Sequence, residues 1–471
     1  MRRIGFYLGF PLFLLINSCF PQQSVVKAPL TQEGEVVVYL QALPQEAEKL
    51  GFTIEAISAV RADSSRIPLS LSLTEVKGHE LVGRQVLLAV GTLPPGSYTG
   101  LSIKFHKAFV QTEEGGMALL VPEEPLGAER LFDIERQKAL ALFLAVNPSQ
   151  LISSAVRFTP SFSLTTPTNI LINLTGYVSN SAANLITVFN KKTMEVVNVL
   201  ATGEKPTGIA LDQRRAKAFV ALSAEDSIQA FDVFSGKTIG RVRLSIGDNP
   251  IYLALTPDGR TLLSANHDSN TLSIIDAVSL LEIERIRVDD GPNSVTVDPS
   301  GLKAYVTNSL SSPVSVVDLT QRTLSLTISV EGTPLRAAFN QRGDSLYLIT
   351  RDKANLLVID PATFTVTKKI FIGMGAASLV VDFRSGLVLV GMRFGGEIII
   401  VDPATSIFID TIGVAGEVVF MTIDRQENTL FALLPGRRLV QKINFTSKKI
   451  MAEIEVSEGA SQVVVVGETS A

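Results

Sequence analysis

Residues 291–332 have the sequence GPNSVTVDPSGLKAYVTNSLSSPVSVVDLTQRTLSLTISVEG, in which four short apolar runs are separated by turn residues. Val, Ile, Thr and Tyr dominate the runs "SVTV", "KAYVTN", "PVSVVD" and "LSLTISV", and these residue types favour extended structure. "DPSG" and residues 318–322 separate the runs with turn-forming residues. The segment therefore predicts a unit of four β-strands.

This unit recurs with a fixed period over residues 170–467. A polar turn residue is predicted to end the third strand of each unit, at Asn190, Asp232, Asp276, Asp318, Asp360, Asp402 and Asn444. Successive members are 42 residues apart, except that 44 separate Asp232 from Asp276. Entry glycines keep a similar rhythm, at Gly203, Gly247, Gly291, Gly332, Gly373, Gly413 and Gly459. A period near 42 with four strands is typical of β-propeller blades, so we expect seven blades.

The two ends of the repeat region are out of phase with each other. Residues 170–200 supply the second, third and fourth strands of a blade, without a first strand before them. Residues 460–467 contain "ASQVVVVG", a lone first strand. Pairing the two completes the seventh blade and closes the ring, which removes the open strand edges that promote aggregation.

The repeat resembles the YVTN family of β-propellers. The resemblance lies in "AYVTNSLSSPVSVVD" at 304–318, "LLSANHDSNTLSIID" at 262–276 and "LLVIDPATFTVTKKI" at 356–370, and it extends over 170–467. It implies a bacterial or archaeal surface or periplasmic protein, but no single function, because this scaffold hosts binding proteins and enzymes alike. The chain contains no Trp, which argues against WD40 blades and the Trp-rich blades of quinone-dependent dehydrogenases.

The length and composition fit a globular protein of two or three domains. The chain has 471 residues, 46% of them hydrophobic, which is enough for several cores. A net charge of −4 with only 19% charged residues provides no basic stripe for nucleic acid.

Residues 1–19 have the pattern of a targeting signal. Arg2 and Arg3 precede an apolar core over residues 4–16, which is too short to span a bilayer reliably. The following "INSC" resembles the lipobox of bacterial lipoproteins, and the resemblance implies that Cys19 is lipidated. The alternative is an ordinary secretory signal in which this Cys has no role.

Cys19 is the single Cys of the chain, which excludes a disulfide framework. Acyl chains on this residue would anchor the protein to a membrane. Within the lipoprotein family, Phe20 rather than Asp after the Cys implies delivery to the outer membrane. Residues 20–32 are short and largely polar, as expected of a tether.

Residues 33–164 lack the 42-residue rhythm and are expected to form a separate β-sandwich domain. Runs such as "EVVVYLQAL" and "RQVLLAVG" predict strands with intervening turns. The segment also resembles a domain-of-unknown-function family found in bacterial lipoproteins, on "LPPGSYTGLSIKFHKAFV" at 93–110, "LLVPEE" at 119–124 and "VRFTPSF" at 156–162. That resemblance implies an architecture and no activity. Residues 165–169 are the expected hinge.

The sequence does not predict a metal, a cofactor or a catalytic site. His79 and His106 are expected to be solvent-exposed, and three scattered His with one Cys do not make a zinc site. No G-x-S-x-G or phosphate-binding G-x-x-x-x-G-K-[ST] motif is present. A calcium role is conceivable for the repeated Asp residues, but one Asp per blade at constant phase is typical of a structural turn.

The loops between the second and third strands are expected to share one rim of the propeller. Acidic residues fall on early blades and basic residues on three consecutive later blades. The candidate binding residues of this rim are Arg351, Lys353, Arg393, Arg437, Arg438, His267 and Asp268. A basic crescent of this kind would steer an acidic partner or a polyanionic sugar toward the face, and ordinary solvated loop charge is the alternative.

These observations lead to one functional hypothesis and one alternative. We expect a lipid-anchored protein of the bacterial envelope, in the outer membrane and facing the periplasm or the surface. Its propeller would be a non-catalytic recognition or scaffold module for an envelope protein, a glycan or a small ligand, and a structural role in an outer-membrane assembly is not separable from this by sequence. The alternative is a hydrolase of the propeller-lactonase kind, which needs polar groups converging on the central channel. The innermost strands are mostly apolar, so the sequence shows no such cluster.

Overall fold

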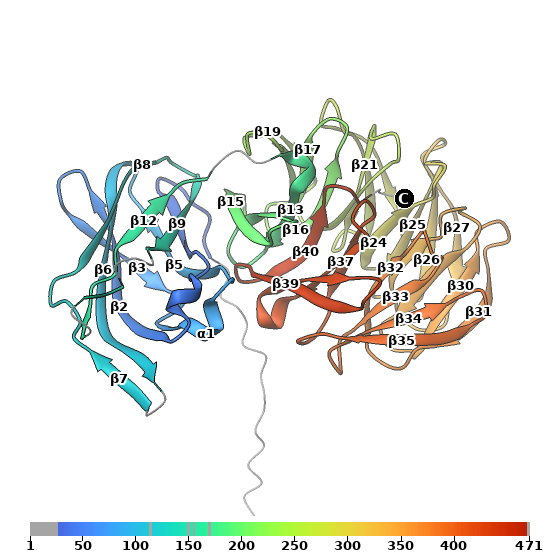
Figure 1. Ribbon diagram of the computed structural model, residues 1–471. Coiled ribbons are helices and arrows are strands. Elements are labelled where there is room, and N and C mark those ends of the chain that lie inside the picture. Colours follow the sequence, from blue (N-terminus) through green and yellow to red (C-terminus); the bar gives the residue numbers. More distant parts are fainter. Residues whose placement is uncertain (1–26, 113–114, 148–150, 154–155, 168–170, 469–471) are drawn as a thin grey trace, which may run out of the picture.

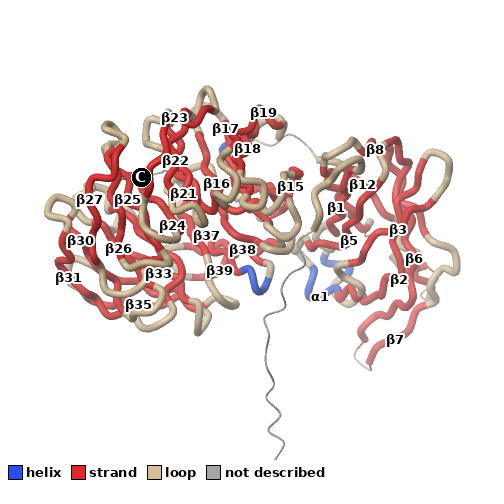
Figure 2. Tube along the Cα trace, turned by 180° about the vertical axis from the view of Figure 1, so that it is seen from behind, coloured by secondary structure: helices blue, strands red, loops and turns tan. Residues whose placement is uncertain are grey.

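The computed structural model describes residues 27–112, 115–147, 151–153, 156–167 and 171–468. Cys19 and residues 20–26 of the expected tether lie outside this part of the chain. Figure 1 shows two bodies side by side, an N-terminal sheet domain and a ring of blades, and Figure 2 shows that strands make up nearly all the regular structure. The all-β fold class is confirmed. No helix among the described residues is long and apolar enough to span a membrane.

The N-terminal domain contains twelve of the strands that the structure describes. They are β1 (Gly34–Leu40), β2 (Leu50–Arg61), β3 (Arg66–Leu71), β4 (Glu75–Lys77), β5 (Val86–Leu93), β6 (Gly96–Thr112), β7 (Gly115–Leu119), β8 (Leu126–Ile134), β9 (Ala139–Val146), β10 (Ile152–Ser153), β11 (Arg157–Phe158) and β12 (Phe162–Thr165). Two short helical turns accompany them, η1 (Gln45–Ala47) and α1 (Gly78–Leu81).

Ten of these strands form one hydrogen-bonded sheet with the main order β12-β9-β1-β5-β3-β2-β6-β7, while β4 and β8 pair with β2 and β6. Only the β1–β9 pair is parallel among the pairings described for this sheet. The sheet encloses an aromatic core in which Phe105 packs edge-on to Phe52 and Phe158. This single path resembles a half-barrel, and the two separate layers of a sandwich stay a prediction.

The remaining strands form seven four-stranded blades within the described residues. From the inner to the outer strand, blade 1 contains β40 (Ala460–Val465), β13 (Thr175–Asn180), β14 (Leu185–Asn190) and β15 (Glu195–Ala201), and blade 2 contains β16 (Pro206–Asp212), β17 (Lys217–Leu222), β18 (Ser227–Asp232) and β19 (Thr238–Arg243). Blade 3 contains β20 (Pro250–Leu255), β21 (Thr261–Asn266), β22 (Thr271–Asp276) and β23 (Leu281–Arg287). Blade 4 contains β24 (Pro292–Val297), β25 (Lys303–Asn308), β26 (Pro313–Asp318) and β27 (Thr323–Ser329).

Blades 5 to 7 follow the same order. Blade 5 contains β28 (Pro334–Phe339), β29 (Leu346–Thr350), β30 (Asn355–Asp360) and β31 (Thr365–Phe371). Blade 6 contains β32 (Ala376–Val381), β33 (Val388–Met392), β34 (Glu397–Asp402) and β35 (Ile407–Gly413). Blade 7 contains β36 (Phe420–Asp424), β37 (Thr429–Leu434), β38 (Leu439–Asn444) and β39 (Lys449–Glu455). The propeller also has two 3-10 turns, η3 (Ile172–Leu174) and η4 (Pro435–Arg437).

The seven inner strands contact one another in a closed ring, from β16 through β40 and back to β16. Closure occurs where it was predicted, because β40 pairs antiparallel with β13, with Gly176 opposite Val465 and Val178 opposite Val463. The seven-bladed propeller, closed by its last strand, is therefore confirmed. The second and third strands are the most buried, and the outer strands are mostly exposed.

Each predicted turn residue, from Asn190 to Asn444, ends the third strand of its blade. Asp276 Oδ1 accepts hydrogen bonds from the backbone N–H groups of Val278 at 3.0 Å and Ser279 at 2.6 Å. These bonds, with the Ser279 hydroxyl, hold the pKa of Asp276 below its usual value. The described residues contain no group of three or more His, Cys, Asp or Glu that could hold a metal ion. The hydrogen bonds from Val278 and Ser279 make Asp276 a turn cap.

The two domains share a buried core. Three hydrophobic side chains of blade 1 pack against five from the sheet domain: Leu185, Val196 and Val199 against Val37, Tyr39, Leu87, Ala141 and Phe143. Gln85 ties the two backbones together, because its side-chain amide exchanges hydrogen bonds of 2.7 and 3.1 Å with the N–H and C=O of Val196. The interface therefore combines apolar packing with a specific backbone contact.

Candidate ligand site in the propeller channel

One position of the repeat brings large side chains together across the channel. The equivalent residues of the seven inner strands, again 42 or 44 residues apart, are Gly208, Tyr252, Ser294, Arg336, Ser378, Phe420 and Gln462. We call them the inner ring. A β-bulge immediately precedes this position in blades 3 to 6, for example between Pro334 and Arg336. A bulge re-aims the side chain that follows it, which suits a site on an otherwise regular scaffold.

Arg336 reaches from blade 5 to contact Tyr252 of blade 3 and Phe420 of blade 7. Its guanidinium carbon lies 4.8 Å from the Tyr252 ring centroid and 5.7 Å from that of Phe420, and the two centroids are 6.5 Å apart. Blades 3 and 7 are each two blades away from blade 5, in opposite directions around the ring. These contacts are in the range of cation–π attraction, which holds the guanidinium in place.

The hydrogen-bonding capacity of Arg336 is largely unused. Its Nε is buried without an acceptor, and Nη1 lies 3.4 Å from the carbonyl oxygen of Asn293. No ion pair to Arg336 occurs in the described part of the chain. Burial lowers the pKa of Arg336, but an arginine stays charged at any physiological pH. A half-buried cation without a counter-charge favours an anion beside it.

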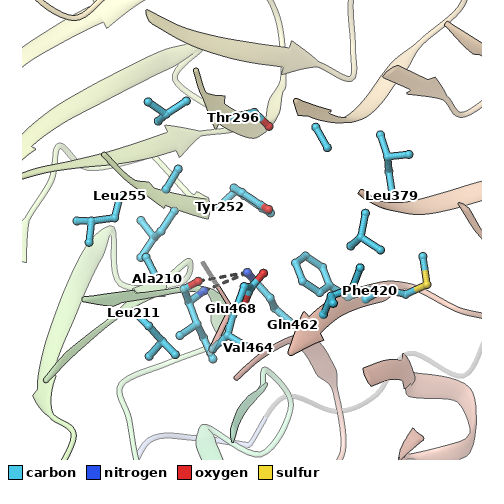
Figure 3. Close-up of a pocket in the computed structure, with 18 of the residues that line it drawn as sticks. Ala210, Leu211, Tyr252, Leu255, Thr296, Leu379, Phe420, Gln462, Val464 and Glu468 are labelled. Carbon is cyan, nitrogen blue, oxygen red and sulfur yellow. Dashed lines mark hydrogen bonds between the residues drawn. The ribbon is translucent and has the colours of Figure 1, made fainter. Parts of the chain in front are cut away.

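A cavity of about 220 Å³ occupies the channel next to these side chains. Figure 3 shows Tyr252, Phe420, Gln462 and Glu468 around the same space. The residues two positions after the inner ring in each strand have small or medium-sized side chains, which leaves space for the cavity. Those that line it are Ala210, Ala254, Thr296, Ala338, Val380 and Val464. The walls are therefore mostly apolar, with polar groups confined to a few places, as in many small-molecule sites.

Gln462 and Gly208 stabilise the inner ring where the propeller closes. The Gln462 side chain accepts a hydrogen bond from Ile209 N–H at 3.0 Å and donates one to Ile209 C=O at 3.2 Å, as the dashed lines in Figure 3 show. A Cβ on Gly208 would lie 2.8 Å from Tyr252 Cα, a backbone atom that cannot swing away. The close approach of two inner strands therefore requires glycine here.

Glu468 enters the cavity from the turn that follows β40. Three contacts hold this turn: Lys191 Nζ donates to Val466 C=O at 2.5 Å, Gln213 Oε1 accepts from Gly467 N–H at 3.1 Å, and Gln213 Nε2 donates to Glu468 C=O. Burial raises the pKa of Glu468 to about 7, against the opposing effects of Thr422 and Arg425. The half-buried carboxyl therefore changes its charge near neutral pH.

Arg425 lies at the same end of the channel as Glu468. Its guanidinium carbon sits 3.4 Å from the Phe383 ring centroid, and its Nε and Nη1 are buried without acceptors. Burial lowers the pKa of Arg425, while the nearby carboxylates of Glu468 and Asp382 raise it. The channel therefore combines two guanidinium groups with a carboxyl that is only partly ionised at neutral pH, a balance that attracts anions.

The rim residues proposed from the sequence lie on the face where the chain enters the inner strands. Backbone N–H groups of the rim loops bond to the entry loops, for example Arg351 to Thr333 C=O at 2.8 Å and Arg393 to Gly375 C=O at 2.7 Å. His267 bonds likewise to Asn249 C=O, and its Nδ1 lies 2.8 Å from Asp268 Oδ1. The structure thus brings these loops to one face.

Most of the predicted basic crescent is paired with acidic residues. Arg393 binds Glu417 at 3.0 Å and Lys353 lies 3.7 Å from Glu331. Arg438 contacts both Glu455 and Glu458, while Arg437 Nε donates to Ala415 C=O at 3.3 Å. Glu331, Glu417 and Glu458 belong to loops between blades, which the sequence analysis did not include in the rim. These pairs reduce the field of the crescent, and a rim site stays a prediction.

Sequence reasoning missed the channel site, because it judged the inner strands too apolar to hold a polar cluster. The signal was present in the phase of the repeat. Tyr252, Arg336 and Phe420 are separated by two steps of 42 residues each, which assigns them to equivalent positions of blades 3, 5 and 7. Equivalent positions of inner strands face one channel, so an Arg flanked by two aromatic residues in this series indicates a contact across it.

Comparison with known proteins gives similar folds and no family. No family model and no curated protein matches the chain. A candidate 6-phosphogluconolactonase from Bacteroides uniformis has a TM-score of 0.54 and 14% identity, over 62% of this chain and 99% of that one. A functionally unknown protein from Desulfotomaculum acetoxidans has a TM-score of 0.54 and 13% identity, over 62% and 98%. The dihydro-heme d1 dehydrogenase NirN has a TM-score of 0.51 and 15% identity, over 65% and 78%.

At these identities the similarity shows the β-propeller fold alone. The three proteins carry different descriptions on one architecture, so the fold does not choose between recognition and catalysis. The YVTN resemblance and the N-terminal domain family stay expectations from the sequence. A functional argument for this chain has to start from its own channel.

Proposed function

We propose that this protein is a non-catalytic recognition module of the bacterial envelope that binds a small anionic ligand in the propeller channel. Lipidation of Cys19 would anchor it, with the outer membrane as the expected location. The observation that carries the ligand proposal is the guanidinium of Arg336, whose Nε lacks an acceptor and which contacts Tyr252 and Phe420, two residues that line an apolar cavity. A carboxylate or phosphate oxygen would supply the missing acceptor.

The site also explains why a rigid ring suits this task. The three contacting side chains come from blades 3, 5 and 7, so closing the ring fixes their spacing before a ligand arrives. Pre-organisation of this kind reduces the conformational entropy that binding would otherwise cost. Apolar walls exclude water and strengthen the interaction between a half-buried guanidinium and an anion.

Arg336→Gln is expected to weaken the binding of small anions by about tenfold or more, since a hydrogen bond to a charged group contributes about 1.5–3 kcal/mol. The probes would be benzoate and inorganic phosphate, titrated against the full chain in detergent and followed by calorimetry. Arg351→Gln is the matched control, because Arg351 lies on the exposed rim.

The double variant Arg393→Glu/Arg437→Glu tests the competing rim site in the same assay. Unchanged affinity in this variant, together with a loss in Arg336→Gln, supports the channel. Weaker binding in the double variant, with unchanged affinity in Arg336→Gln, would show that the anion binds at the rim. Circular dichroism of all variants shows whether a loss of binding merely reports a loss of folding.

Hydrolysis of a lactone is the second candidate function, and Glu468 is the observation that favours it. A carboxyl with a pKa of about 7 inside a cavity is suited to act as a general base toward water. Arg336 would then stabilise the negative charge that develops on the lactone oxygen. If this reading holds, δ-valerolactone hydrolysis rises with pH through about 7 in the wild type and is lost in Glu468→Gln. A rate equal to the buffer blank would rule out hydrolysis for this class of lactone.

A further inference from the structure

We propose that the channel ligand is a compact acid with a hydrogen-bond donor, such as an ammonium or hydroxyl group, at the end opposite its carboxylate. This inference rests on the proposed anion-binding function and specifies the ligand class. Three parts of the channel carry it: the guanidinium of Arg336, the apolar cavity, and the carboxyl group of Glu468.

The carboxylate end follows from the position of Arg336. Its planar guanidinium presents a fixed fork of N–H donors that matches the two oxygens of a carboxylate. Tyr252 and Phe420 both contact it, and its Nε is buried without an acceptor. An anion bound here is therefore held in one orientation.

The compact body follows from the size of the cavity. A cavity of about 150 Å³ in another protein is large enough for benzene. The channel cavity of about 220 Å³ therefore accommodates roughly one six-membered ring with short substituents. Ala210, Ala254 and Ala338 provide apolar wall surface and no hydrogen bonds from their side chains. The body of the ligand is accordingly apolar, and a glycan chain or a folded peptide does not fit.

The donor at the far end follows from Glu468. Glu468 follows the end of the inner strand β40 and lines the cavity, whereas Arg336 lies near the start of the inner strand β28 and contacts the cavity-lining rings of Tyr252 and Phe420. The two groups therefore lie toward opposite ends of the channel. Burial is the main reason that the pKa of Tyr252 is raised; Arg336 lowers it and Glu468 raises it further. A carboxyl oxygen accepts hydrogen bonds in either protonation state, so a ligand donor is the complementary group.

Three probes separate the parts of this inference. Benzoate carries the anion and the ring, 4-(aminomethyl)benzoate adds an ammonium group, and benzylamine lacks the carboxylate. We expect the full-length wild type in detergent at pH 8 to bind 4-(aminomethyl)benzoate about tenfold more tightly than benzoate, because a charge-assisted contact contributes about 1.5–3 kcal/mol. Benzylamine should be the weakest of the three. Glu468→Gln should make the affinities of the two acids equal, and Arg336→Gln should weaken both.

The pH dependence provides a second readout. With a pKa of about 7, Glu468 is mostly ionised at pH 8 and mostly protonated at pH 6. The advantage of the ammonium probe should therefore shrink as pH falls from 8 to 6, while benzoate binding changes little. Arg425, Thr422 and Tyr252 face this carboxyl, and Asp382 acts on it through Arg425. Of these groups Asp382 is the other carboxylate, and it acts on Arg425 as Glu468 does. Asp382→Asn is therefore the control for a pH effect that reaches the ligand through Arg425.

The outcomes distinguish this inference from the function on which it rests. If benzoate binds through Arg336 but the ammonium group adds nothing, the donor end is wrong and anion recognition stands. If neither acid binds, both proposals fail. If benzylamine binds more tightly than benzoate, the site selects cations and the assignment of Arg336 is overturned.

Discussion

Replacing Lys191 with methionine is expected to lower the free energy of unfolding by about 3–5 kcal/mol, the usual cost of removing one partner of a buried ion pair. Lys191 Nζ lies 2.6 Å from Asp424 Oδ2, and the two side chains are only 2% and 0% exposed. Without the ammonium group, the Asp424 carboxylate would be left in a low-dielectric environment without its counter-charge. Lys191 also donates to Val466 C=O, so the variant loosens the closing turn as well.

Chemical denaturation monitored by circular dichroism measures this loss. Lys192→Met is the matched control, since the neighbouring Lys192 is exposed and its removal should change stability little. Equal stability of the two variants would contradict the account of a buried pair. The pair joins residues of blades 1 and 7, so its loss should be accompanied by weaker protection of β40 from hydrogen exchange.

Replacing Gln85 with leucine is expected to cost about 2–4 kcal/mol and to loosen the sheet domain from blade 1. The substitution leaves the N–H and C=O of Val196 without their partners inside a buried interface. Each unsatisfied buried backbone group costs about 1–3 kcal/mol. The apolar core around Tyr39 remains, so the domains should stay associated while the contact at β15 becomes labile.

Hydrogen exchange at β15 is the most direct measurement of this effect. The Val196 amide should exchange faster in Gln85→Leu than in the wild type, and the midpoint of denaturation should fall. Gln45→Leu, at an exposed position of the same domain, is the control and should change neither. Unaltered exchange at Val196 would show that apolar packing alone fixes the two domains.

The sequence predicts the ring because the features that define it are local. Asp318 caps a turn through the N–H groups of Thr320 and Gln321, at 2.9 and 2.8 Å, only two and three residues away. Such contacts leave the same mark in each blade, so residues 42 apart reveal the architecture without knowledge of any distant contact. Closure by residues 460–465 follows from counting the strands that are present.

The candidate site depends on contacts between distant residues, and these leave no local mark. Arg336 meets Tyr252 and Phe420 only because the blades close into a circle. Glu468 belongs to a turn after the last strand, outside the repeat, and three contacts from other segments aim it into the channel. On the rim, Glu417 pairs with Arg393 from a loop between blades. The parallel pairing of β1 with β9 is similarly long-range.

The pairing of β13 with β40 sets the order in which this protein can fold. It joins Gly176 to Val465, so the first blade keeps an open edge until nearly the whole propeller has been synthesised. Closing so long a loop carries a large entropic cost, and contacts of this separation form slowly. Gln462 and Glu468 reach the channel only in that step. The ligand cavity therefore exists only in molecules that have completed the ring, and a bound ligand would stabilise the closed ring relative to forms in which β40 is unpaired.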